Sequence, residues 1–579
     1  MKDSLSIKRK SGGRGHSIAL LGTNLYYEIP ISIFRAARDV ARRKNYGLLY
    51  FSGETYRSPL GFEAQANILY DLISSRIACG LVIVSNLLSS FSTPHEFRDF
   101  CLQFNPLPMV SLGMAIEGIP SVVPGNEKGM YDAVSHLIDV HRYSRIAFLS
   151  GPYHHPDVVE RFSGFHRAME SHGLSVAEDL LLTGDFKHES GVEAVKELID
   201  KRGKKPGTDV EAIVCCNDYM ASGAMLELQR RDIKIPDQIA LTGFDDIHFS
   251  ECLFPPLSSV RYPFDSLTVK AMDILLRVIE GKSVSAVEEV EARLFPRCSC
   301  GCPDTGERER SSSVYSELPY RRVSSRFPEG INRQIIKSVR PTLMEWKPAL
   351  RRLYGAGRLD LLSDSNTSED EMTDMELLGR IAGYTFNSAN YQMVIHNMGS
   401  ALTSTLDLSE LFEILTQLLP GAEISRCCIC LYESPQDSPG KLPPSSRLVF
   451  AFGENGTEKL PPQGLPFATE ELLPAQIIGS IGPAGWVVLP LYFREDQLGY
   501  LLMDSDAPHE HLHWNLSNQI SSALKGTRLL EETRSTNELL KAANEQKTQF
   551  FINVAHETKT PLTLISNYLS LYMEEHEAD

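Results

Sequence analysis

Short apolar runs alternate with amphipathic segments from Ser17 to about Pro303. The runs are almost continuously apolar and are bounded by Gly, Ser, Asn or Asp, which is typical of strands buried on both faces of a parallel sheet. The predicted strands are Ser17–Gly22, Gly47–Phe51, Gly80–Val84, Met109–Leu112, Arg145–Ser150, Ala212–Cys216 and Ile239–Phe244, and helices are predicted at Ile31–Lys44, Met130–Asp139, Arg161–His172 and Ala221–Arg231. We therefore expect a multidomain α/β protein, with a polar tail over residues 1–15 and a two-lobed unit of parallel sheets over residues 16–303.

The pattern changes after residue 303. Residues 304–395 have helical stretches without strands between them and predict a helical linker. Residues 396–525 predict a smaller α+β unit, and residues 526–579 predict a final helix with no internal Gly or Pro between Thr527 and Thr560. The α+β unit combines a helix at Leu408–Leu419 with strands at Cys427–Tyr432, Leu448–Phe452, Gly485–Tyr492 and Gly499–Asp504.

Composition and charge narrow the possible environments. The chain has 579 residues, and 57 Lys and Arg against 74 Asp and Glu give a formal net charge of −17. This acidic balance argues against a nucleic-acid partner. No stretch approaches the ~18 apolar residues of a membrane span, and the basic N-terminus has no apolar segment typical of a secretory signal. The eleven cysteines do not form a small disulfide framework, so we predict a cytoplasmic protein without a membrane partner.

Polar residues follow several of the predicted strands. Asn217 and Asp218 follow one strand, Asp245 and Asp246 follow another, and Arg161 opens a helix after the loop with His154 and His155. Ligands bind beyond the carboxyl ends of parallel strands, and these side chains offer donors and acceptors suited to hydroxyl groups. The alternatives are structural: Asn217 or Asp218 caps the next helix, Asp246 is a turn residue, and the two histidines are solvated.

These residues also carry a resemblance. Asn217–Ala224, Ile235–Asp246, Pro255–Val260 and Arg161 followed by Gly164-Phe165 resemble the effector-binding core of lactose/galactose-repressor-type (LacI-type) regulators. The resemblance implies a type I periplasmic-binding-protein-like domain whose lobes close on a small, carbohydrate-like ligand, with Arg161, Asn217 and Asp245 as ligand contacts. The family's helix-turn-helix is expected before the first strand, where only the short polar N-terminus stands, so its DNA binding is not carried over. Gly125-Asn126 stands where the family often has an acidic residue.

A cysteine cluster, Cys298, Cys300 and Cys302, closes this first unit. Three thiolates could bind zinc, but a structural zinc site needs four ligands, usually including C-x-x-C pairs. No histidine lies near the cluster in the sequence. We therefore expect a structural or incidental role for the cysteines, and no metal.

The α+β unit resembles a GAF domain. Thr403–Leu408 leads into its first helix, and Val488–Leu491 followed by Gly499–Asp504 matches the family's central hairpin. Such domains bind small molecules or relay a signal. The sequence shows no ligand constellation here, which favours a relay.

The final helix carries a heptad pattern. Its apolar seam has spacings of 3, 4, 3, 4, 3 and 4, which predicts a coiled coil or helical bundle. The seam residues are Phe551, Val554, Thr558, Pro561, Ile565, Tyr568 and Tyr572. His556 falls at the outermost position, Glu557 lies beside it, and Pro561 should kink the helix.

His556 allows three interpretations. A zinc-protease H-E-x-x-H motif is excluded, because Thr560 stands where the second histidine is required. A solvated surface histidine is the plain alternative. Phe550–Leu562, however, resembles the phosphoacceptor box of sensor histidine kinases. That resemblance implies that His556 is phosphorylated, that Glu557 is the base and that Thr560 assists dephosphorylation of a response regulator.

The combined prediction is a ligand-sensing histidine kinase of a two-component phosphorelay. Its phosphoryl donor would be ATP, bound by a domain outside this sequence. It would form a homodimer through the C-terminal helix, with Leu529–Lys547 as a signalling segment. The competing hypothesis is a non-enzymatic, sugar-responsive binding or regulatory protein that is related to repressors but lacks their DNA-binding domain.

Overall fold

A computed structural model describes residues 17–303, 407–433, 441–453, 456–474, 476–477, 485–504 and 510–576. The predicted polar tail (1–15) and helical linker (304–395) lie outside the described residues, as do residues 396–406 at the start of the predicted GAF-like unit.

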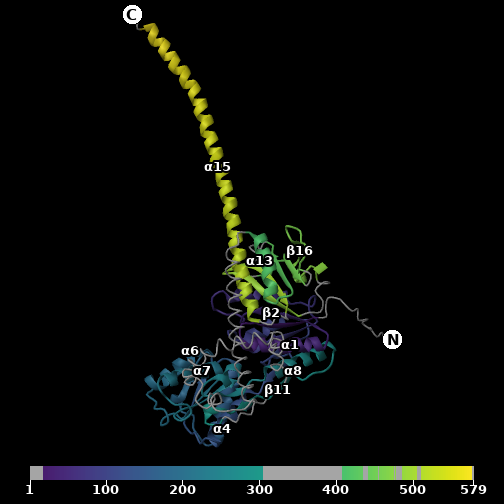
Figure 1. Ribbon diagram of the computed structural model, residues 1–579, viewed down its shortest axis with the longest axis vertical. Coiled ribbons are helices and arrows are strands. Elements are labelled where there is room, and N and C mark those ends of the chain that lie inside the picture. Colours follow the sequence, from purple (N-terminus) through teal and green to yellow (C-terminus); the bar gives the residue numbers. More distant parts are fainter. Residues whose placement is uncertain are drawn as a thin grey trace, which may run out of the picture.

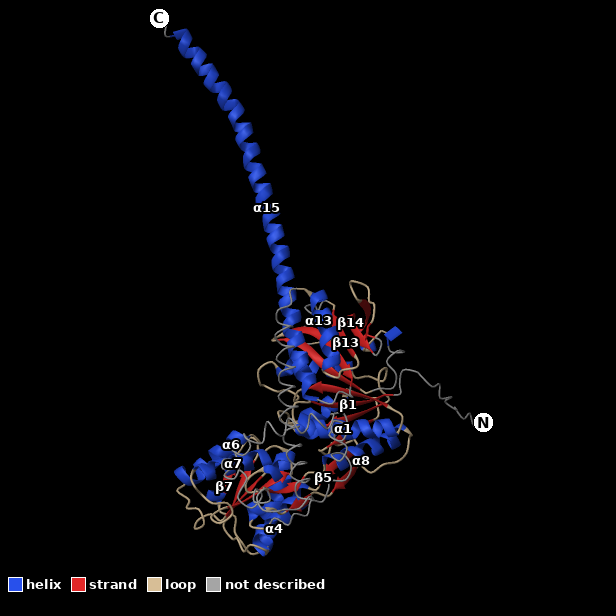
Figure 2. Cartoon of the chain, viewed as in Figure 1, coloured by secondary structure: helices blue, strands red, loops and turns tan. Residues whose placement is uncertain are grey.

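The first unit has two lobes, each built on a mainly parallel sheet (Figure 2). Lobe 1 has the strand order β11-β5-β4-β3-β1-β2, and lobe 2 has the order β12-β10-β9-β8-β6-β7. The lobe 1 strands are β1 (Ser17–Thr23), β2 (Gly47–Gly53), β3 (Gly80–Val84), β4 (Met109–Leu112), β5 (Ser121–Pro124) and β11 (Val287–Val290). The lobe 2 strands are β6 (Ile146–Ser150), β7 (Leu181–Thr183), β8 (Ala212–Cys215), β9 (Ala240–Asp245), β10 (Ser258–Arg261) and β12 (Arg293–Phe295). Only the β10–β12 pair is antiparallel within these two sets of strands.

Helices cover both faces of these sheets, because the central strands are buried on both sides. Lobe 1 carries α1 (Glu28–Arg43), η1 (Glu63–Leu72), α2 (Ser85–Leu88), α3 (Pro94–Leu102) and α8 (Phe264–Ile279). Lobe 2 carries α4 (Asn126–Asp139), α5 (Pro156–Ser171), α6 (His188–Lys196), α7 (Asp218–Arg230) and the short turns η2 (Glu178–Leu180), η3 (Glu197–Lys201), η4 (His248–Cys252) and η5 (Cys298–Cys300). The seven predicted strands and four predicted helices of this unit are all present, with ends shifted by a few residues.

The second unit is an antiparallel sheet with helices. Its strands are β13 (Cys427–Tyr432), β14 (Ser445–Gly453), β15 (Gly456–Thr457), β16 (Leu465–Ala468), β17 (Trp486–Phe493) and β18 (Asp496–Asp504). Helix α13 (Leu408–Gly421), the turn η8 (Thr469–Glu471) and the long helix α15 (Glu510–His576) complete the unit. The predicted α+β character of this region is therefore confirmed.

The two units share one sheet. Strand β17 pairs in parallel with β2 of lobe 1, with Trp486 opposite Leu49 and Val488 opposite Phe51. The lobe 1 strands and the strands of the second unit thus form a single 12-stranded sheet. The sequence predicts two separate units, but the buried apolar residues on each face of this sheet come from both.

Helix α15 has a docked part and a protruding part (Figure 1). Leu512, Leu516 and Ile520 are buried against the second unit, whereas every side chain from Leu529 to Ser570 is exposed. The predicted seam residues from Phe551 to Tyr568 therefore pack against nothing in the described chain, and the side chain of Tyr572 lies outside the described set. The helix begins at Glu510, before the predicted start at residue 526, and continues through Pro561.

None of the helices in the described ranges is long and apolar enough to cross a membrane.

Candidate ligand-binding site

Arg161 is the centre of a polar cluster at the carboxyl ends of the lobe 2 strands. Its side chain is only 2% exposed. Its Nε donates to Asn126 Oδ1 at 2.9 Å, its Nη1 donates to the Cys216 carbonyl, and its Nη2 lies 3.5 Å from Asp157 Oδ2 and 3.6 Å from Asp245 Oδ1. The structure thus brings the predicted contacts Arg161 and Asp245 together.

Aromatic rings complete the surroundings of the Arg161 guanidinium. Its central carbon lies 3.8 Å from the ring centre of Phe244 and 5.8 Å from that of Tyr262. A guanidinium that is fixed over a ring keeps its orientation. Sequence reasoning identified Arg161 but gave no sign of this aromatic support.

The charges in this cluster are strongly perturbed. Burial acts to lower the pKa of Arg161, but the carboxylates of Asp245 and Asp157 outweigh this effect and raise the pKa. Burial raises the pKa of Asp245 to about 7, although Arg161 opposes the rise. Asp245 also has a φ of +103°, a conformation in which few residues other than Gly, Asn and Asp are common. Buried groups whose pKa values are shifted by a specific charge partner are typical of functional sites.

Asn217 and Asp218 have different roles. Asn217 caps α7, since its Oδ1 accepts from the Met220 N–H at 3.0 Å while its Nδ2 donates to the Phe186 carbonyl at 2.9 Å. Asp218 is a buried acceptor that receives hydrogen bonds from the hydroxyls of Ser250 and Ser259, both at 2.6 Å, and from the Ile247 N–H. The capping alternative is therefore confirmed for Asn217. The side chain of Asp218 instead holds the loop that follows Asp245.

Asp246 is an ion-pair residue. Its carboxylate receives hydrogen bonds from Arg261 at 2.8 Å and from Arg297 at 2.6 Å, so it joins β10 to the segment before η5. It also has a positive φ of 52°. The turn interpretation is thus correct for its backbone, and its side chain has a structural partner.

His155 lies where the two lobes meet. The sequence predicts a solvated residue, but the side chain is 6% exposed, and its Nε2 lies 3.3 Å from the carbonyl oxygen of Asn86 in lobe 1. Asn86 in turn donates from Nδ2 to the Tyr262 hydroxyl at 3.0 Å. The prediction for His155 is wrong because a residue at the start of α5 is covered by the opposite lobe.

A small pocket marks the same junction. It is lined by Ser89, Ser90, Ser92, Pro94 and Met114 from lobe 1 and by His154, His155 and Pro156 from lobe 2. Asn86 Oδ1, just after β3 of lobe 1, and Ser150 Oγ, at the end of β6 of lobe 2, are both buried. Neither atom has a hydrogen-bond partner in the described part of the chain. Buried polar atoms of this kind are costly unless something satisfies them. A hydroxylated ligand between the lobes could do so.

The predicted phosphoacceptor residues lie far from this site, on the protruding part of α15 (Figure 1). His556, Glu557 and Thr560 are all exposed. Thr560 Oγ1 donates to the His556 carbonyl at 3.2 Å, which is an ordinary contact within a helix. Consecutive helix residues such as His556 and Glu557 do not face each other.

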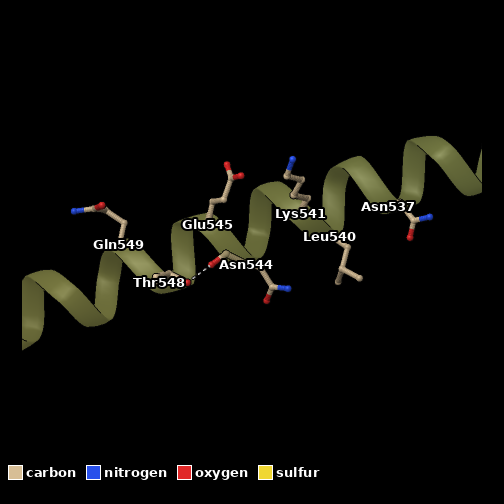
Figure 3. Close-up of a pocket in the computed structure, with 7 residues that line it drawn as sticks. All are labelled: Asn537, Leu540, Lys541, Asn544, Glu545, Thr548 and Gln549. Carbon is tan, nitrogen blue, oxygen red and sulfur yellow. Dashed lines mark hydrogen bonds between the residues drawn. The ribbon is translucent and has the colours of Figure 1, made fainter.

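A shallow groove on α15, between its docked part and His556, is formed by one helix only (Figure 3). Thr548 donates to the Asn544 carbonyl at 2.8 Å, again within the helix. The groove residues are Asn537, Leu540, Lys541, Asn544, Glu545, Thr548 and Gln549. Because no second element encloses the groove, a small molecule placed there would remain in water, and we do not regard it as a binding site.

The cysteine cluster lies against two histidines that are distant in sequence. His136, on α4, and His141, just after it, meet Cys300 and Cys302. Sequence reasoning missed both histidines. The sequence feature that could have identified them is the spacing between the two histidines, since H-x₄-H falls within the H-x₃₋₅-H range of zinc sites.

Known proteins resemble part of this chain. Residues 134–300 match the family described as the periplasmic binding protein-like domain. The HTH-type transcriptional regulator AscG of Escherichia coli K12 is 28% identical over 305 residues, which are 52% of this chain and 86% of AscG. The HTH-type transcriptional repressor PurR of Vibrio campbellii is 31% identical over 236 residues, which are 40% of this chain and 65% of PurR.

The crystal structure of E. coli AscG aligns with a TM-score of 0.40 at 26% identity, covering 49% of this chain and 98% of that structure. The first unit is a periplasmic-binding-protein-like α/β domain with parallel sheets. The chain spans just under two thirds of PurR.

These relatives overturn the prediction of a sensor histidine kinase. Both are HTH-type transcriptional regulators, so the predictions of an enzyme and of a response-regulator partner are wrong. The kinase prediction depended on a short motif, Phe550–Leu562, whereas the similarity to regulators extends over hundreds of residues. The roles predicted for His556, Glu557, Thr560 and ATP depended on the kinase and are not carried further.

The predicted exclusion of nucleic acid is also wrong. The relatives are helix-turn-helix proteins, a class that binds DNA. The exclusion was based on a net charge of −17 summed over the whole chain. DNA binding requires only a local basic surface, which such a sum does not reveal.

Proposed function

We propose that this protein is a ligand-responsive regulator related to transcriptional regulators, in which a small hydroxylated, sugar-like molecule binds between the two lobes. The observation that carries the proposal is the buried Arg161, held by Asp157, Asp245 and Asn126 at the edge of lobe 2. A fully buried guanidinium with two carboxylates is expensive to maintain for stability alone.

The proposed ligand contacts are Arg161, Asp245 and Asn217. Asn217 would use the hydrogen-bonding capacity that remains after it caps α7. Arg161 would donate to ligand oxygens, and Asp245 would accept from ligand hydroxyls. Lobe 1 lies close to this side of lobe 2, since burial, and then the charge of Glu28 in lobe 1, raise the pKa of Tyr219 on α7 to about 12. Ligand binding would thus favour the closed arrangement of the lobes.

The same proposal includes a role for the second unit. A GAF-like relay joined to lobe 1 through β17 would carry the change to α15, whose exposed part would act through contact with a partner. The similarity to transcriptional regulators supports gene regulation as the output and the cytoplasm as the site of action. No disulfide joins the ten cysteines whose side chains the structure describes, which suits a reducing compartment.

The experiment is isothermal titration calorimetry of the full chain with a panel of monosaccharides, disaccharides and nucleosides. At least one panel member should bind, and Asp245→Asn should weaken its binding about 10- to 100-fold through loss of a charge-assisted hydrogen bond. Asn tolerates the positive φ at this position. Failure of every panel member to bind, or equal affinity in Asp245→Asn, would contradict the proposal.

Asp232→Asn is the matched control. Asp232 is exposed and also has a positive φ, of 56°, so the substitution makes the same chemical change outside the site. It should leave the affinity unchanged. The regulatory output is then tested by measuring binding of genomic DNA fragments to the full chain with and without the panel member that binds.

A further inference from the structure

Four potential metal ligands converge on one point at the surface of lobe 2. The ligand atoms of His136, His141, Cys300 and Cys302 all lie within 4.8 Å of one another. Cys302 Sγ lies 3.3 Å from His136 Nε2 and 3.4 Å from His141 Nε2, and Cys300 Sγ lies 3.6 Å from His136 Nε2. Both cysteines are free thiols.

These distances match the edges of a small tetrahedron. With Zn–S near 2.3 Å and Zn–N near 2.0–2.1 Å, tetrahedral geometry places sulfur and nitrogen about 3.5 Å apart. The three printed S···N distances, 3.3, 3.4 and 3.6 Å, lie around that value. Two thiolates would also balance the charge of a divalent cation, which suits a half-buried position.

The segment that carries the two cysteines is firmly held. Ser299 lies between Cys298 and Cys300. Its Oγ donates to the Leu241 carbonyl at 2.6 Å and accepts from the Ser258 N–H at 2.8 Å. The ring of Tyr143 stacks on that of His141, with centres 5.7 Å apart and an angle of 20° between the planes. Such outer contacts fix the orientation of metal ligands.

Gly301, between Cys300 and Cys302, is shaped for this arrangement. It has a φ of +108°, and a Cβ at this position would lie 3.0 Å from His141 Nδ1. Only glycine allows both the left-handed turn and the close approach of the imidazole. The backbone therefore brings the two sulfurs to the same side as the two rings.

We propose that His136, His141, Cys300 and Cys302 bind one zinc ion. Binding displaces the two thiol protons to solvent, and the two neutral imidazoles bind through nitrogen. The ion ties the end of the first unit, just before residue 303, to the last part of α4. Asn126, which contacts Arg161, begins α4 about 15 Å away along the helix axis. The zinc site is thus separate from the proposed ligand site, and its role is to fix the end of lobe 2.

The test uses the full chain purified under reducing conditions and measures bound zinc by mass spectrometry before and after incubation with zinc. We expect about one zinc per chain, and less than a tenth of that in Cys302→Ser and in His141→Ala. Cobalt(II) added to the unsubstituted protein should give the visible absorption of tetrahedral Co(II) with thiolate charge transfer. Because the cobalt measurement needs no substitution, it remains informative even if a variant fails to fold.

Two control variants define the ligand set. Cys298→Ser changes a neighbouring cysteine outside the four-residue group, and His166→Ala changes an exposed histidine on α5. Both should retain one zinc. Absence of zinc and of tetrahedral cobalt absorption from the unsubstituted reduced protein would overturn the site, and equal loss of zinc in Cys298→Ser would overturn the assigned ligands.

Discussion

At the scale of single residues, Arg161 shows how a buried charge is tolerated in lobe 2. Five groups satisfy it: an amide oxygen, a carbonyl oxygen, two carboxylates and an aromatic face. Removing one partner of such a cluster leaves an uncompensated charge, which costs about 3–5 kcal/mol in comparable cases. The titration of Asp245 therefore bears on both stability and binding.

Asp245→Asn should change the pH dependence of stability. The Asp245 carboxyl has a pKa of about 7 in the folded protein because it is buried, and about 3.9 when unfolded. Between these values the folded state holds a proton that the unfolded state has lost, so ionisation lowers stability as pH rises. Asn cannot ionise. The free energy of unfolding of Asp245→Asn, minus that of the unsubstituted protein, should therefore rise by about 2.6 kcal/mol from about pH 5 to pH 8.

Urea unfolding at both pH values measures this difference. The pairing of ionised Asp245 with Arg161 is already included in the folded-state pKa, so the remaining offset, which comes from replacing a neutral carboxyl by an amide, should be similar at both pH values. Asp232→Asn, exposed and also at a positive φ, should show no such rise. A difference that stays constant with pH in Asp245→Asn would show that Asp245 is ionised throughout.

Gly301→Ala should reduce zinc retention. The new Cβ would lie 3.0 Å from His141 Nδ1, and the φ of +108° would be strained for Ala. Gly281→Ala is the control: its φ of +71° imposes comparable backbone strain, but nothing lies within 4 Å of the added Cβ. We expect zinc loss in the first variant only, measured as bound zinc per chain after dialysis. Equal retention in both would mean that the imidazole moves aside.

Residue roles could be predicted only where local sequence determines them. Asn217 could be recognised as a cap because it follows a strand and precedes a helix, and the cap bond to Met220 is local. The meeting of Cys302 with His136 joins residues 166 positions apart, and no local pattern encodes it. His155 was mispredicted for the same reason, since its partner Asn86 lies 69 positions away in the other lobe.

At the scale of elements, α15 combines two environments in one continuous helix. Its first part buries apolar residues at helical spacing, including Leu512, Leu516 and Ile520. Its later part exposes equally apolar residues, such as Leu540 at 60% and Phe551 at 59%. Exposed apolar stripes of this length usually mark interaction surfaces.

A matched pair of substitutions tests this division. Leu516→Ala should lower the free energy of unfolding by about 2–5 kcal/mol, because it removes a buried side chain and leaves a cavity. Leu540→Ala should change it by about 0.5 kcal/mol or less, because that side chain is exposed. Both are measured by urea unfolding at low protein concentration. A cost for Leu540→Ala similar to that of Leu516→Ala would show that the protruding part of α15 packs against a partner under these conditions.

Elements were predictable where burial is uniform. The first-unit strands, such as Gly80–Val84, are apolar on both faces, and this property alone distinguishes them. Five strands were not predicted: the edge strands β7, β11 and β12, and the inner strands β5 and β10, whose sequences SVVP and SSVR include polar residues or proline. The start of α15 was placed too late because its first turns contain several polar residues.

At the scale of the whole molecule, the shared sheet joins the ligand-binding unit to the second unit. Strand β17 alternates its side chains between the two faces, with Val487 and Leu489 on one and Trp486 and Val488 on the other. Each face continues the apolar core of lobe 1 into the second unit. The sequence could not predict this pairing, because β2 and β17 lie more than 400 residues apart and either could have been an edge strand.

Trp486→Ala should therefore destabilise both units together. Trp486 is 4% exposed, lies opposite Leu49 of β2 and has Arg426 over its ring, so truncation should cost about 3–5 kcal/mol. If the sheet is one cooperative structure, hydrogen exchange should rise in β1 as well as in β13. Hydrogen-exchange mass spectrometry on peptides from residues 17–23 and 427–432 measures this directly.

Leu465→Ala provides the comparison, because Leu465 lies in β16, which pairs with β14 at the far side of the second unit. Its effect on exchange should remain within residues 441–468, since β16 makes no pairing with lobe 1. If Trp486→Ala raised exchange only within the second unit, the β2–β17 pairing would be a contact between independent domains. Exchange that rises in both units would instead mean that ligand binding between the lobes can change, through lobe 1, the stability of the strands against which α15 is docked.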